Sequence, residues 1–81
     1  MPNIQKLRDA SFRIQDGRCY YCQEPMWSND PVAFAKAHAL SLALARRLQA
    51  TAEHLTPRSE GGDDGEANLV AACLYCNTLG T

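Results

Sequence analysis

Residues 53–77 of the chain read EHLTPRSEGGDDGEANLVAACLYCN, and the end of this stretch carries the Cys73-Leu-Tyr-Cys76 pair. A second pair with the same spacing, Cys19-Tyr-Tyr-Cys22, lies upstream. Two thiolates three positions apart can bind one ion, and two such pairs complete a tetrahedral set of four sulfurs. The spacing therefore predicts a structural Zn²⁺ site that uses every cysteine of the chain.

Two disulfides in a secreted protein are the alternative interpretation of these cysteines. The first residues show no basic, apolar and small-residue signal sequence, so we expect an intracellular, cytoplasmic protein with reduced thiols. No apolar run approaches the ~20 residues that cross a bilayer, and no membrane association is expected. A chain of 81 residues predicts one domain whose core is small enough for a metal to matter.

The charge of the chain argues mildly against tight, nonspecific binding to nucleic acid. The formal net charge is -1, without the basic excess expected of a stand-alone nucleic-acid binder. A few arginines on one face can still contact phosphates while acids elsewhere lower the total. The composition therefore leaves a nucleic-acid substrate possible without requiring one.

Two helices are predicted before residue 51. An apolar stripe at helical spacing and the Asp16-Gly17 stop predict an amphipathic helix over residues 3–15. Residues 18–27 predict a strand-like knuckle with a turn at Glu24-Pro25. The Ala- and Leu-rich residues 31–50, with a capping residue before Pro31, predict one continuous helix. The stripe of the first helix consists of Ile4, Leu7, Ser11 and Ile14.

The long stretch itself predicts three further segments. Residues 51–55 alternate as a short strand does, and residues 57–65 are rich in turn residues and acids, as a polar loop is. A final helix is expected to begin near Glu66 or Ala67, which would place Cys73 and Cys76 on one face.

The order Glu53-His54-x-x-Pro57-x-Ser59-x-Gly61-Gly62, then Asn68-Leu69-Val70, then Cys73-x-x-Cys76-Asn77, resembles the HNH endonuclease family. The similarity covers roughly residues 19–27 and 51–77. It implies an α+β fold with a small ββα-metal core, in which two short strands and a helix surround a catalytic cation, beside a separate four-cysteine zinc site. The expected domain covers residues 1–81, divided into an N-terminal helix at 1–17, a first zinc knuckle at 18–27, an inserted helix at 31–50, and the ββα-metal motif with the second zinc pair at 51–79.

The resemblance implies an endonuclease that hydrolyses DNA with Mg²⁺ or another divalent cation such as Mn²⁺ or Ni²⁺. His54 would be the general base, because an imidazole with a near-neutral pKa can take a proton from the attacking water. The cation would stabilise the leaving 3′ oxygen, and the product would carry a 5′ phosphate. The alternative for His54 is a structural or zinc-shell histidine.

Glu53 and Asn77 are the ligands that the resemblance implies for the catalytic cation. Carboxylate and amide oxygens suit a hard cation, although the family usually has Asp where this chain has the longer Glu53. The alternatives are an exposed strand acid for Glu53 and a helix C-cap for Asn77.

Other positions in and near the motif are assigned lesser roles. Asn68 matches the middle asparagine of the motif and is expected to fix the loop and the backbone near His54, with simple capping as the alternative. Arg58 is a candidate phosphate contact, with an exposed loop arginine as the alternative. The loop acids, Asp63 and Asp64 among them, are expected to solvate the loop rather than to bind metal.

One departure from the family pattern bears on partners. The family often carries Lys or Arg directly after the final motif residue, whereas this chain has Thr78. With the low net charge, this predicts a weak nickase or nuclease, or a subunit that relies on a targeting protein or an additional DNA-binding domain. Cutting both strands with one active site would favour a homodimer or sequential nicks. The competing functions are a noncatalytic zinc module that binds nucleic acid or protein and, more remotely, a redox protein that uses its Cys-x-x-Cys pairs.

Overall fold

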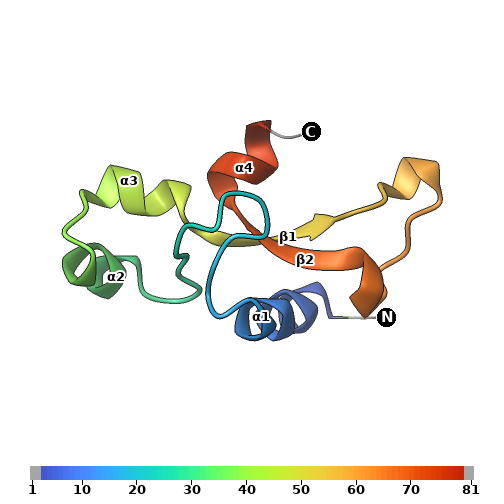
Figure 1. Cartoon of the computed structure of the whole chain (residues 1–81), viewed down its shortest axis with the longest axis horizontal. Coiled ribbons are helices and arrows are strands. Elements are labelled where there is room, and N and C mark those ends of the chain that lie inside the picture. The colour runs from blue at the N-terminus through green and yellow to red at the C-terminus, as the bar shows by residue number, and fades with distance from the viewer. Residues whose placement is uncertain (1–2, 80–81) are drawn as a thin grey trace.

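The computed structural model describes residues 3–79, which form four α-helices, two 3₁₀ turns and a two-stranded antiparallel sheet (Figure 1). This is the small α+β fold that the sequence predicted. The molecule is elongated, with extents of 40 × 23 × 18 Å. In chain order the elements are α1 (Ile4–Ile14), α2 (Pro31–Ala37), α3 (Leu42–Arg47), β1 (Ala50–His54), η1 (Arg58–Glu60), η2 (Glu66–Asn68), β2 (Leu69–Cys73) and α4 (Leu74–Leu79).

The β1–β2 hairpin forms the centre of the molecule. Its register places Ala50 opposite Cys73 at one end and His54 opposite Leu69 at the other. In Figure 1, α1 and α4 lie on opposite sides of the hairpin, α2 and α3 project from one end, and the connection containing η1 extends from the other. The hairpin therefore separates the cysteine end of the molecule from the end that carries His54.

Helix α1 protects the outer edge of β2. Asn3 caps the helix by accepting a hydrogen bond from the Lys6 N–H. The Gln15 side chain donates to the Ala71 carbonyl at 2.8 Å and accepts from the Ala71 N–H at 2.9 Å, so it replaces a missing neighbouring strand. The predicted placement of Ile14 on the packed face was wrong: Ile14 is 83% exposed, because Gln15 takes the position against the sheet.

The first knuckle turns earlier than predicted. The predicted turn at Glu24-Pro25 was wrong, because Pro25 pairs with Arg18 across an antiparallel bridge and the turn occupies residues 20–22. Gln23 closes that turn with a positive φ of 65°, and its N–H donates to the Cys19 carbonyl. The tight turn brings Cys19 and Cys22 to the same side of the knuckle.

The predicted continuous helix over residues 31–50 was also wrong. Helix α2 ends at Ala37, and Ala39 adopts a φ of 54° while the Leu40 N–H donates back to the Ala35 carbonyl. The Ser41 side chain then caps a new helix by accepting from the Leu44 N–H at 3.2 Å. The left-handed Ala39 and the Ser41 cap therefore divide the segment into two helices, although the residues on both sides of the break favour a helix.

The segment before the second cysteine pair is a strand and not the start of the final helix. Helix α4 begins at Leu74, whereas the predicted helix began near Glu66 or Ala67. Leu69 to Cys73 instead pair along their whole length with β1. A short apolar run of this kind does not distinguish strand from helix by periodicity, and pairing with β1 decides it.

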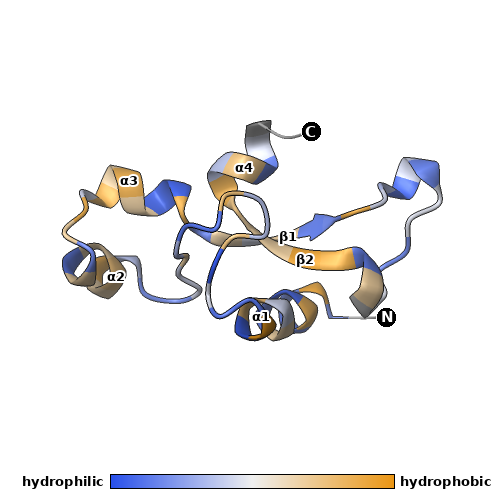
Figure 2. Cartoon of the chain, in the orientation of Figure 1, coloured by the Kyte–Doolittle hydropathy of each residue, from blue (hydrophilic) through white to orange (hydrophobic). Residues whose placement is uncertain are grey.

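The buried core is small and built largely from sulfur and alanine. Cys19 and Cys73 are the largest side chains that are fully buried among the described residues. Figure 2 shows hydrophobic residues along β2 and hydrophilic residues in the connection around η1. Because alanine side chains bury little apolar area, hydrophobic burial contributes little stability at the cysteine end of the hairpin. The core cluster consists of Cys19, Met26, Ala50, Ala71, Ala72 and Cys73.

None of the helices within residues 3–79 combines the length and the apolar character that a membrane span requires.

Candidate functional site

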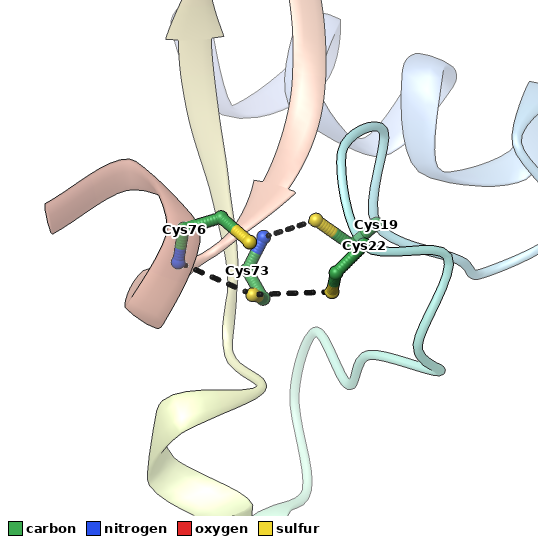
Figure 3. Close-up of side chains that lie close together, drawn as sticks. All are labelled: Cys19, Cys22, Cys73 and Cys76. Atoms are coloured by element: carbon green, nitrogen blue, oxygen red, sulfur yellow. Dashed lines mark hydrogen bonds between the residues drawn. The ribbon is translucent and has the colours of Figure 1, made fainter. Parts of the chain in front are cut away.

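The four cysteines meet where the first knuckle faces the junction of β2 and α4 (Figure 3). Their Sγ atoms all lie within 4.8 Å of one another, and those of Cys22 and Cys73 are 3.9 Å apart. In a tetrahedral site with Zn–S bonds of about 2.3 Å, neighbouring sulfurs lie about 3.8 Å apart. All four are free thiols. The cluster therefore fits a zinc site, as the spacing predicted.

Backbone N–H groups point at the sulfurs of this cluster. Cys19 Sγ accepts from the Tyr21 and Cys73 N–H groups, and Cys73 Sγ accepts from the Cys76 N–H. Burial opposes ionisation of Cys19, but hydrogen bonds from the backbone of Cys22, and then of Cys73 and Tyr21, outweigh it and lower its pKa to about 7. Burial raises the pKa of Cys73 and of Cys76, and the Cys19 side chain adds to both increases. Four adjacent thiols ionise together only with a cation between them, which is the chemistry of a zinc site.

Glu53 lies on β1 with its carboxylate inside the protein. The residue is 8% exposed, and its Oε2 atom is buried without a hydrogen-bond partner. The alternative interpretation as an exposed strand acid was therefore wrong. Burial and then the nearby Glu53 charge raise the pKa of Tyr21. A buried carboxylate oxygen without a donor is costly, and a cation would satisfy it.

Asn77 faces the same side of β1 as Glu53. Its Nδ2 atom donates to Thr51 Oγ1 at 3.0 Å and to the Ala52 carbonyl at 3.2 Å. Side chains two positions apart in a strand point to one face, so Glu53 shares the face of Thr51 on which α4 lies. The strand thus brings the two predicted ligands of the catalytic cation to one side of the sheet.

His54 ends β1 and contacts Asp64, which was expected only to solvate the loop. Its Nε2 atom lies 2.7 Å from Asp64 Oδ1. Arg58 Nη2 donates to both oxygens of the same carboxylate, at 2.7 and 2.8 Å. The hydrogen bond with His54, followed by that with Arg58, lowers the pKa of Asp64. His54 does not belong to the four-cysteine cluster that could hold a metal ion.

Asn68 closes the loop between the strands. Its Oδ1 accepts from the Thr56 N–H at 2.7 Å, and its Nδ2 donates to the carbonyls of Thr56 and Asp63 at 3.0 and 2.7 Å. These hydrogen bonds make Asn68 a clamp on the loop. Gly62 packs against this clamp, and a Cβ added there would overlap the Thr56 carbonyl oxygen and lie 2.9 Å from Asn68 Nδ2. The clamp fixes the path of the loop that carries Asp64.

Replacing Gly62 with alanine is expected to lower the free energy of unfolding by about 1–3 kcal/mol, because the new methyl must displace backbone. Urea denaturation of the zinc-loaded protein measures the change. Gly65→Ala is the matched control, since its Cβ would meet the end of the flexible Asp63 side chain at 3.1 Å. Equal losses in the two variants would contradict the close packing at Gly62.

The structure thus groups the predicted residues into two places. The four cysteines form one cluster, and the opposite end of the hairpin carries His54. Asp64 was expected only to solvate the loop, but it contacts both His54 and Arg58. The assignment of Arg58 as a phosphate contact stays a prediction. The acid-rich composition of the loop offered no signal that one acid turns inward toward the histidine.

A family model described as HNH endonuclease matches residues 41–81, just over half of the chain. The matched region includes both hairpin strands and the second cysteine pair, whereas the first pair lies outside it. No curated protein matches the chain, and no solved structure matches it.

Proposed function

The chain belongs to the HNH endonuclease family, and on this basis we propose that it hydrolyses phosphodiester bonds in DNA with a divalent cation. His54 is the general base. It stands at the end of β1, half-buried, where one ring nitrogen is engaged by Asp64. An imidazole held in this way accepts a proton from an attacking water at its other nitrogen.

Glu53 and Asn77 would hold the catalytic cation through a carboxylate and an amide oxygen. Magnesium, manganese and nickel are candidates, and such an ion, when bound, supplies Lewis-acid stabilisation to the leaving 3′ oxygen. The sheet supports this proposal, because Glu53 and Thr51 share a face and Asn77 donates to Thr51. Asn68 contributes by fixing the loop next to His54 and not by contact with DNA.

The observation that carries this proposal is the buried, unpartnered Oε2 atom of Glu53 next to His54 in the chain. A purely structural strand would not require an acid at a position that is 8% exposed. A noncatalytic zinc module would need the cysteines but neither Glu53 nor His54. The two residues therefore favour an enzyme over a binding module.

Zinc-loaded protein incubated with supercoiled plasmid tests the proposal. Nicked or linear product is expected with added Mg²⁺, Mn²⁺ or Ni²⁺, and none is expected after the added cation is chelated under conditions that leave zinc bound. Absence of cleavage with every cation, on both single- and double-stranded DNA, would favour the noncatalytic module.

Replacing Glu53 with glutamine is expected to raise the Mn²⁺ concentration for half-maximal cleavage by about 10- to 100-fold, because a neutral amide is a weaker ligand for a hard cation. A manganese titration of the cleavage rate measures the shift. Glu60→Gln removes the same charge from an exposed residue of η1 and serves as the control. An unchanged titration in Glu53→Gln would show that this carboxylate does not hold the cation.

The charge of the chain contributes little to its affinity for DNA, the proposed substrate. The formal net charge of -1 provides little general attraction for DNA, and Thr78 offers no charge directly after Asn77. We propose that a targeting protein or a second copy of the chain supplies the missing affinity. Arg58, whose side chain is 64% exposed, is a candidate phosphate contact in this proposal.

A further inference from the structure

We propose that Asp64 is a positioning residue that fixes the tautomer and the orientation of the His54 ring. The inference rests on the proposed function, and it adds a residue that the sequence motif leaves without a role. It starts from one contact, the 2.7 Å separation of His54 Nε2 and Asp64 Oδ1.

The chemistry of the two groups determines the direction of this hydrogen bond. An ionised carboxylate only accepts, so Nε2 must carry the proton. The opposite nitrogen, Nδ1, is then the acceptor of a neutral imidazole and the atom that can take a proton from water. After that transfer, the imidazolium is stabilised by the carboxylate against which it already lies.

Arg58 holds the Asp64 carboxylate, and Asn68 holds the backbone next to it. Arg58 donates to both of its oxygens, which leaves the carboxylate little freedom to rotate away from His54. The backbone next to it is held by Asn68, which donates to the Asp63 carbonyl at 2.7 Å. Asp63 also accepts from the Gly65 N–H at 3.0 Å, which tightens the turn around Asp64.

These contacts link the motif residues of the loop to His54, the proposed general base. Asn68 and Gly62 determine the path of the loop, the loop presents Asp64, and Asp64 orients His54. Within residues 3–79, the Asp64 carboxylate forms hydrogen bonds with His54 and Arg58, and not with Glu53 or the four sulfurs. We therefore assign its effect on the general base to its contact with the imidazole, while its contact with Arg58 holds the carboxylate in place.

The test compares Asp64→Ala with Asp63→Asn in zinc-loaded protein. The first removes the acceptor of His54, and the second removes one negative charge next to it while keeping the oxygen that accepts from Gly65. We expect Asp64→Ala to lower kcat for plasmid cleavage by about 10- to 100-fold, the range for loss of a group that orients a functional histidine, with KM within about threefold. Asp63→Asn should behave as the wild type.

A second readout does not depend on cleavage. Nitrogen-15 NMR of neutral His54 should show the proton on Nε2 alone in the wild type and in Asp63→Asn, and a mixture of both tautomers in Asp64→Ala. A mixture already present in the wild type would overturn the inference, as would equal kcat values in the two variants or a rise in kcat for Asp64→Ala. If no protein cleaves DNA, the proposed function fails while the tautomers still decide the role of Asp64.

Discussion

Replacing His54 with alanine is expected to lower kcat for plasmid cleavage by about 10²- to 10⁴-fold, the usual contribution of a positioned general base. Zinc content and the unfolding midpoint should change little, because the side chain is half-buried at the end of β1 and its hydrogen-bond partner is the side chain of Asp64. Asp64 keeps Arg58 as a partner when the imidazole is absent. Cleavage rates and zinc content of the two proteins give the measurement.

His38→Ala is the matched control for this variant. His38 is the other of the two histidines, is exposed, and contacts Phe34 with ring centroids 4.4 Å apart. It caps the end of α2, on the part of the molecule that projects from the cysteine end of the hairpin. Wild-type cleavage by His38→Ala is expected. Equal cutting by His54→Ala and His38→Ala would exclude His54 as the general base.

Removing zinc, or replacing Cys73 with serine, is expected to unfold the protein. Structural zinc binds zinc-finger peptides with about 10–16 kcal/mol at neutral pH, whereas a whole domain is stable by only about 5–15 kcal/mol. The core of this chain is small, and Cys73 and Cys19 are its largest fully buried side chains. Circular dichroism before and after chelation, with metal analysis of the variant, measures the effect.

Ala72→Ser separates the loss of a ligand from the burial of a hydroxyl group. Ala72 precedes Cys73 on β2 and is fully buried in the same core cluster. Its replacement by serine should retain zinc and cost about 1–3 kcal/mol, the penalty for an unsatisfied buried hydroxyl. A Cys73→Ser protein that keeps zinc and folds as well as Ala72→Ser would remove the basis for the zinc site.

The parts of the structure that local spacing controls were predictable. Two Cys-x-x-Cys pairs predict a sulfur cluster because three-residue spacing brings thiolates together in any tight turn, and the cluster was confirmed. The short strand at Glu53-His54 was predicted from alternation, and β1 differs from it by one residue at each end. The position of Asn77 on the final helix was also correct.

Other features depend on contacts that no local pattern reveals. The break at Ala39 interrupts a segment in which nearly every residue favours a helix, and it requires a left-handed residue followed by the Ser41 cap. Leu69 to Cys73 become a strand only because β1 is present to pair with them. Tertiary pairing here overrides a helix signal that was reasonable on the sequence alone.

At the candidate active site, the position of Asp64 likewise could not be predicted from the local sequence. It is one acid in a loop with several, and its inward direction depends on the tight packing of Gly62 and the clamp of Asn68. The burial of Glu53 was likewise invisible in a strand whose other residues are small or polar. Each depends on how the loop and α4 fold back on the hairpin.

Anomalous diffraction from crystals of the zinc-loaded protein soaked in Mn²⁺ tests most directly whether the cysteines are support and the Glu53-His54 strand is the reaction centre. We expect a zinc peak among the four Sγ atoms and a separate manganese peak between the side-chain oxygens of Glu53 and Asn77. Manganese found only among the sulfurs, or absent beside Glu53 at a concentration that supports cleavage, would contradict this division of roles.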